Sequence, residues 1–96
     1  MEFFFIVTSS TMGEDVLLEF KKLGIANYTQ LPLAHGSGVG GGTKFGNDIW
    51  PGDNTVFFTV TETEKYNEMK KWVEEYRTQE IREGMKIINL AVKEII

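Results

Sequence analysis

Apolar residues gather in short runs along the first quarter of the chain, and their spacing changes from one run to the next. Residues 3–7 are all apolar and β-prone, which predicts a strand buried on both faces. The four consecutive hydroxyl side chains at residues 8–11 predict contacts that cap a helix. From Gly13 the apolar positions follow a helical stripe, and Gly24 suits the residue just after a helix end. The stripe comprises Val16, Leu17, Phe20 and Leu23, with Leu18 outside it.

The rest of the chain repeats the order of strand, helix and strand. Residues 27–34 predict a second strand, in which Pro32 removes a backbone donor and favours an edge position or a bend. After a glycine-rich stretch, residues 55–60 predict a third strand. A helix follows, for which Thr61 and Glu64 have capping-box spacing. Gly84 interrupts the chain before a last strand at residues 86–92. The second helical stripe comprises Tyr66, Met69, Trp72, Val73 and Tyr76.

This order predicts an α+β fold of the ferredoxin-like βαββαβ type, built as one domain over residues 1–96. Its four-stranded antiparallel sheet carries two helices on one face, with the first and third strands in the middle. Phe3 and Phe5 should point to one face and Phe4 to the other, and Phe57 and Phe58 should divide likewise. The second face then needs a cover, so we expect a homo-oligomer with its sheets turned inward. The alternative is a monomer that leaves some phenylalanine exposed.

Composition narrows the functional classes. A net charge of −4 disfavours a nucleic-acid partner, and the chain contains no cysteine for disulfides, thiolate metal sites or thiol nucleophiles. No run approaches the length of a membrane span, and the first ten residues lack the basic start of a signal peptide. We therefore expect a soluble cytoplasmic protein without membrane insertion.

A long loop, residues 36–53, separates the two halves. Six of the ten glycines fall between residues 36 and 46, and such a loop is typically functional or disordered. Backbone amides of Gly36, Gly38 and Gly40 could form a concavity for an anion, to which Lys44 would add charge. The alternative is a linker with no phosphate role, because neither a dinucleotide fingerprint nor a P-loop is present.

Three further residues near this loop carry candidate chemistry. Phe45 and Trp50 are large apolar residues among polar ones, which indicates contacts with a partner protein or, for Trp50, an anchor to the body. His35 is the only histidine, so it is either a surface residue or one ligand of a metal site shared between subunits. No Ser-His-Asp set is apparent, and a role other than an enzyme is favoured.

Two segments resemble the PII signalling superfamily. Gly36-Ser37-Gly38 corresponds to the Gly-Phe-Gly segment that opens the partner-binding T-loop of that family. The run GMKIINLAVKE at residues 84–94 is similar to the family's C-terminal strand, with Met85 inserted. In the nucleotide loop, Thr78 and Gly84 match. The resemblance implies a trimer that binds ATP, ADP or AMP in clefts between subunits and reports occupancy to a partner protein through the loop.

Three functional hypotheses follow. The first is a PII-like sensor of a small anionic ligand, in which Lys44 or Lys86 would neutralise phosphate and Gly84 would lie at the site. The second is a metal-binding trimer with a CutA-like role, or a minor enzyme, that uses His35 with Asp48 or Asp53. The third is an assembly module without a small ligand.

Overall fold

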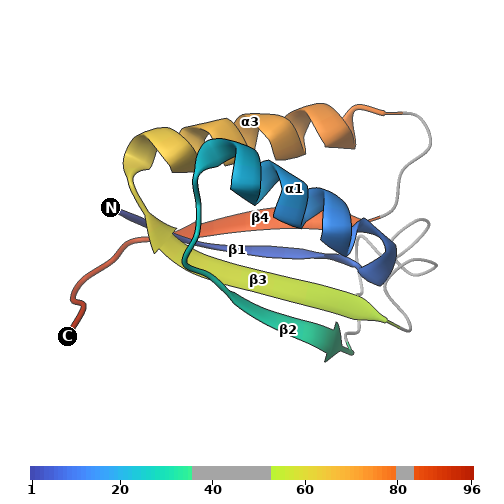
Figure 1. Cartoon of the computed structure of the whole chain (residues 1–96), viewed down its shortest axis with the longest axis horizontal. Coiled ribbons are helices and arrows are strands. Elements are labelled where there is room, and N and C mark those ends of the chain that lie inside the picture. Colours follow the sequence, from blue (N-terminus) through green and yellow to red (C-terminus); the bar gives the residue numbers. More distant parts are fainter. Residues whose placement is uncertain (36–52, 80–83) are drawn as a thin grey trace.

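The chain folds into one four-stranded sheet with both helices on the same face (Figure 1). The computed structural model describes residues 1–35, 53–79 and 84–96. The sheet has the strand order β2-β3-β1-β4, and every neighbouring pair is antiparallel, which confirms the ferredoxin-like prediction. The elements are β1 (Glu2–Ser9), a 3-10 turn (Ser10–Met12), α1 (Gly13–Leu23), β2 (Thr29–Ala34), β3 (Asn54–Thr61), α3 (Thr63–Arg77) and β4 (Met85–Leu90).

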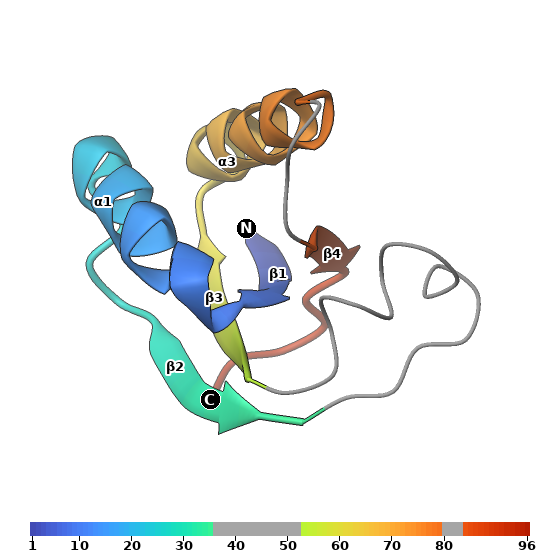
Figure 2. The ribbon, with the colours of Figure 1, turned by 90° about the vertical axis from the view of Figure 1, so that its right-hand side faces the viewer.

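The core lies between the sheet and the helices, as the end view in Figure 2 makes visible. Alternate residues of the central strands β1 and β3 point into it, because side chains in a strand alternate between faces. Phe4, Ile6 and Phe57 are completely buried there. The helices contribute Val16, Phe20, Met69 and Val73, which belong to the predicted stripes. Apolar spacing in the sequence therefore identified this face correctly.

Both predicted capping arrangements are wrong. Met12 occupies the cap position of α1 and makes no side-chain cap bond, because β1 continues to Ser9 and a 3-10 turn precedes the helix. At α3 the cap position falls on Glu62, one residue beyond the expected Thr61. Thr61 is still paired with Glu2 in the sheet, and its hydroxyl donates to Glu62 Oε1 at 3.1 Å. Strand pairing thus extends through the residues that looked like caps.

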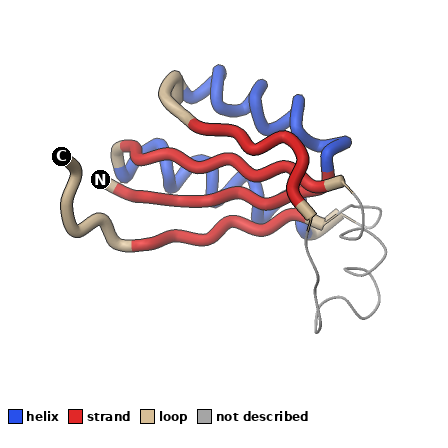
Figure 3. Tube along the Cα trace, turned by 90° about the horizontal axis from the view of Figure 1, so that it is seen from below, coloured by secondary structure: helices blue, strands red, loops and turns tan. Residues whose placement is uncertain are grey.

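The edge position predicted for the second strand is confirmed, but the last strand is shorter than the sequence predicted. β2 is an outer strand, and its register with β3 shifts between Leu31 and Ala34, around Pro32. β4 ends at Leu90 and not at Val92, since its partner β1 has almost no residues left beyond Phe3. Residues 91–96 follow without regular structure (Figure 3). Gly24 ends α1 with a φ of 74°, as predicted for a left-handed position.

Candidate functional site

The sheet face opposite the helices, called the open face below, carries a cluster of three phenylalanines. The ring of Phe5 lies 5.1 Å from that of Phe3 and 5.3 Å from that of Phe58, measured between centroids. Phe3 and Phe58 lie 6.2 Å apart. The predicted division of phenylalanines between the two faces is therefore confirmed. Figure 3 looks onto this face, and neither described helix covers it.

Aliphatic side chains extend the phenylalanine cluster across all four strands. In the register, Phe5 lies between Phe58 and Ile88, and Phe3 lies between Val60 and Leu90. Ile88 and Leu90 are 45% and 44% exposed, and Leu31 of β2 is 49% exposed. The open face is thus an apolar surface that no described helix covers, exposed at its outer strands and half-buried along β1 and β3. The apolar residues that share this face are Phe3, Phe5, Val7, Leu31, Val56, Phe58, Val60, Ile88 and Leu90, and its polar residues include Thr29 and Lys86.

A hollow of about 570 Å³ opens at one end of this apolar surface. Phe3, Phe58 and Val60 form its floor, Thr59 also lines it, and residues 26–29 form its wall. Residues 26–28 belong to the connection between α1 and β2, and Thr29 begins β2, so the wall joins the helical layer to the edge of the sheet. The volume lies within the range of small-molecule sites. The hollow combines aromatic rings with the polar groups of a connecting segment.

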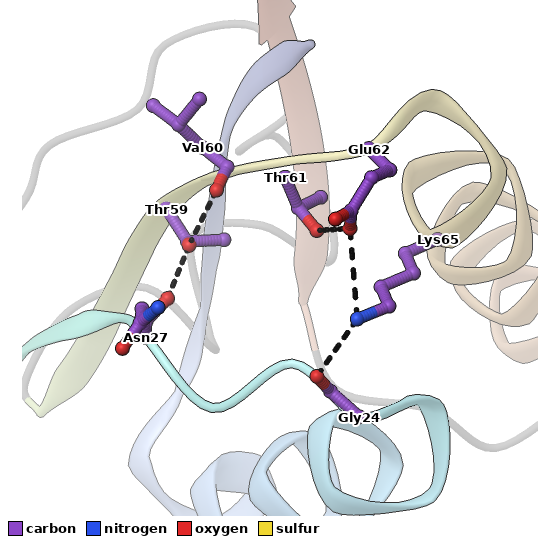
Figure 4. A network of polar contacts seen from close by, with 7 residues as sticks. All are labelled: Gly24, Asn27, Thr59, Val60, Thr61, Glu62 and Lys65. Carbon is purple, nitrogen blue, oxygen red and sulfur yellow. Dashed lines mark hydrogen bonds and ion pairs between the residues drawn. The ribbon is translucent and has the colours of Figure 1, made fainter. Parts of the chain in front are cut away.

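A polar network fixes the wall of the hollow against the junction of β3 and α3 (Figure 4). Lys65 Nζ donates to the carbonyl oxygen of Gly24 at 2.9 Å and forms an ion pair with Glu62 at 3.5 Å. The Thr59 hydroxyl donates to the carbonyl oxygen of Asn27. The connection between α1 and β2 is therefore tied at Asn27 to Thr59 of β3 and at Gly24 to Lys65, which follows β3.

Glu62 shows how this network affects ionisation. The pKa of Glu62 is lowered from 4.5, first by a hydrogen bond from its own backbone, then by the Thr61 hydroxyl and by the positive charge of Lys65. Each of these contacts favours the carboxylate over the neutral acid. The network is therefore complete only while Glu62 is ionised.

The structure describes five of the candidate site residues named above, of which Asp53 and Thr78 are exposed, whereas Asp48 lies outside the described residues. Lys86 is exposed on β4 opposite Val7, so it lies on the open face. Gly84 is buried, and its carbonyl oxygen accepts hydrogen bonds from the Thr8 hydroxyl at 2.8 Å and the Ser9 amide at 3.3 Å. His35 is exposed after β2. The other candidates lie outside the described residues: Gly36, Gly38, Gly40, Lys44, Phe45 and Trp50.

The described part of the chain does not bring these residues into one site. Gly84 and Lys86 lie at the end of the sheet where β1 finishes, whereas the hollow lies where β1 begins. At ~3.3 Å per residue, the distance along β1 from Phe3 to Val7 is about 13 Å. Within residues 1–35, 53–79 and 84–96, no three metal-ligating side chains form a group. The metal hypothesis for His35 therefore gains no support there.

Sequence reasoning missed the hollow. Its wall is the short segment at residues 26–29, and its floor comes from β1 and β3, which begin at Glu2 and Asn54, far from that segment in the sequence. The one available signal was the excess of phenylalanine in β1 and β3, which indicated the surface but not the depression in it.

Among the described residues, no helix has the length and apolarity to cross a membrane.

Comparisons with known proteins connect this geometry to a fold. No family model matches the chain, and no curated protein matches it in sequence. Among solved structures, a PII-like signaling protein from Thermus thermophilus matches with a TM-score of 0.63 at 22% identity, covering 93% of this chain and 84% of that one. CPII, a nitrogen regulatory PII-like protein from Thiomonas intermedia, matches with a TM-score of 0.67 at 12% identity, covering 99% and 94%. The CPII structure contains ADP, AMP and bicarbonate. The chain therefore has the fold of PII-like signalling proteins.

Proposed function

We propose that this chain is a cytoplasmic PII-like regulatory protein that senses a small anionic ligand in clefts between the subunits of a homotrimer. An adenine nucleotide is the first candidate for the ligand. The open face carries this proposal, because it presents three clustered phenylalanines and exposed aliphatic residues that no described helix covers. Apolar patches of this kind in small domains mark sites of association.

A sister chain is the partner that the surface fits best. The open face is apolar in all four strands and contains Lys86 near one end, so it matches another apolar sheet better than a charged partner. Packing one sheet on another would bury the phenylalanine cluster in the way that covered sheets do in other proteins. The resemblance to the PII superfamily described above implies three copies, and we adopt that number in the proposal.

The hollow supplies a place for the base of a nucleotide. Phe3 and Phe58 offer aromatic surface, and the polar atoms of residues 26–29 border it. Stacking of a base on an aromatic ring contributes roughly 1–3 kcal/mol. Lys86 and Gly84 of the same chain lie at the other end of β1 from the hollow, so the proposal assigns the phosphate contact to Lys86 and Gly84 of a neighbouring copy. ADP and AMP in the structure of CPII support this ligand class.

The long loop completes the proposal. Backbone amides of Gly36, Gly38 and Gly40, together with Lys44, would contact the anionic part of the ligand. Phe45 or Trp50 would then be presented to a partner protein. All of these residues lie outside the described part of the chain, so the chemistry of their side chains and their position between β2 and β3 are the basis for this step.

Native mass spectrometry with and without ATP, ADP, AMP and bicarbonate tests this function. We expect a trimer that retains one of these ligands, and a thermal transition that rises when the same ligand is added. Lys86→Ala should weaken binding, whereas Lys71→Ala, which removes an exposed lysine from α3 on the covered side, should not. A monomer, or a trimer that ignores all four compounds, would contradict the proposal.

A further inference from the structure

The hydroxyl-rich turn at residues 8–11 has no capping role, so its side chains need another explanation. Thr8 is completely buried, and its hydroxyl donates to the carbonyl oxygen of Gly84, 76 positions later in the chain. The amide of Ser9 donates to the same oxygen. In the register, Thr8 is opposite Met85, so these two bonds continue the pairing of β1 with β4 one residue beyond the end of the strand.

Other contacts hold the same part of the chain from outside the sheet. Arg77, the last residue of α3, donates from Nη1 to the carbonyl oxygen of Met85. The carbonyl oxygen of Gly84 thus accepts hydrogen bonds from residues of β1, and that of Met85 accepts one from the last residue of α3. Lys86 follows directly and lies on the open face. These hydrogen bonds therefore hold the backbone that directly precedes Lys86, which is itself paired opposite Val7 in the sheet.

We propose that Thr8 is a positioning residue for ligand binding: its hydroxyl holds Gly84 so that Lys86 meets the negative charge of the bound ligand. This inference rests on the proposed function, and it adds a residue that neither the sequence motifs nor the fold assigns. Thr8 itself is buried beneath the ladder and makes no contact with the ligand. Its effect passes through the backbone of residues 84–86.

The same turn also supports the segment that precedes β3. The amide of Ser10 donates to the carbonyl oxygen of Asp53 at 3.0 Å, and Ser9 is opposite Asn54 in the register. One short turn therefore holds the residues that come directly before β3 and directly before β4. A substitution of Thr8 is expected to act mainly on the residues before β4, because among the described contacts the Thr8 hydroxyl bonds only to Gly84.

Thr55 provides a matched control. It is directly opposite Thr8 in the register, it is 2% exposed, and its hydroxyl also donates to a backbone carbonyl oxygen, that of Leu31 at 3.2 Å. Thr55→Val therefore also removes a buried threonine hydroxyl from the sheet, but one that bonds to β2 and not to the residues before β4. Comparing it with Thr8→Val separates a general loss of stability from a specific loss of position.

Calorimetric titration with ADP or ATP, combined with amide hydrogen exchange of the free protein, tests the inference. We expect Thr8→Val to weaken nucleotide affinity by about threefold to tenfold and to raise exchange at Met85 and Lys86 by a similar factor, the change expected for one hydrogen bond. Thr55→Val should lower the thermal transition comparably while leaving affinity and this local exchange within twofold. Thr8→Ser, which keeps the donor, should restore both.

The outcomes are distinguishable. A wild-type chain that binds none of ATP, ADP, AMP and bicarbonate would contradict the proposed function itself. Wild-type binding that is equally strong in Thr8→Val, or equally weakened in Thr55→Val, would overturn the positioning role alone. If Thr8→Val does not fold, Thr8→Cys gives a second reading, because a thiol is a weaker donor of similar size. The nucleotide affinity of Thr8→Cys should then fall between those of the wild type and Lys86→Ala. An affinity equal to that of the wild type would overturn the positioning role of Thr8.

Discussion

Phe57 and Phe58 are neighbours in β3, yet they belong to different environments. Phe57 is completely buried, with its ring 5.7 Å from that of Phe20 of α1. Phe58 is half-buried and contacts only rings of its own face among the described aromatic pairs, those of Phe3 and Phe5. The chain covers one face of its sheet with its own helices and leaves an equally aromatic face without such a cover. Burial of a phenylalanine in this sheet therefore depends on whether a helix packs against its face of the sheet, and not on the residue type.

The strongest test of this contrast compares Phe57→Ala with Phe58→Ala. Removing Phe57 leaves a cavity under the helices, so we expect a loss of about 3–5 kcal/mol in the free energy of unfolding at every protein concentration. Removing Phe58 should cost little in a dilute monomer and progressively more as the proposed oligomer forms. Chemical denaturation at several protein concentrations measures both. Equal, concentration-independent losses would mean that the two faces do not differ in this way.

A charge on the open face sharpens the comparison further. Phe58→Asp would bury an unpaired carboxylate in the proposed interface, which is unfavourable by several kcal/mol in an apolar setting. We expect this variant to remain folded and to behave as a single chain of 10.9 kDa in light scattering, while the wild type assembles.

Leu18→Asp is the control for this variant. Leu18 is 58% exposed on α1, on the other side of the molecule from the open face. Its substitution should leave assembly unchanged. Assembly of Phe58→Asp as strong as that of the wild type would argue that the open face is not the interface.

The order of elements and the division of faces could be predicted from the sequence, since both depend on local spacing. The run at residues 3–7 indicates a strand that is apolar on both faces, and the stripe beginning at Val16 indicates which face of its helix is apolar. The start of α1 at Gly13 also agrees with the sequence, but the cap of α1 and the start of α3 could not be placed in this way. Thr61 has the right chemistry for a cap, but its pairing with Glu2, 59 positions away, keeps it in the sheet.

The candidate site was less predictable because it depends on contacts between distant segments. Thr8 and Gly84 meet only when β1 and β4 are paired, and nothing near either residue indicates the other. The hollow likewise forms where residues 26–29 pass over β3. Glycine-rich composition indicated the loop at residues 36–53 as a candidate site. The spacing of residues could not locate the hollow or the contact between Thr8 and Gly84.

The smallest expected effect concerns the polar network that ties the wall of the hollow to the covered side. Because the pKa of Glu62 is lowered in the folded chain, its carboxylate stabilises the fold at pH values above 4.5, and this contribution is lost as the pH falls through the lowered pKa. Glu62→Gln should therefore be less stable than the wild type at neutral pH, and the difference should shrink on acidification. Glu68→Gln, an exposed change on the same helix, serves as the control. Thermal melts of the three proteins between neutral pH and pH ~3 measure the effect, since an ordinary glutamate titrates near pH ~4.3. A difference between Glu62→Gln and the wild type that stays constant or grows toward low pH would show that the ionised carboxylate does not hold the connection between α1 and β2.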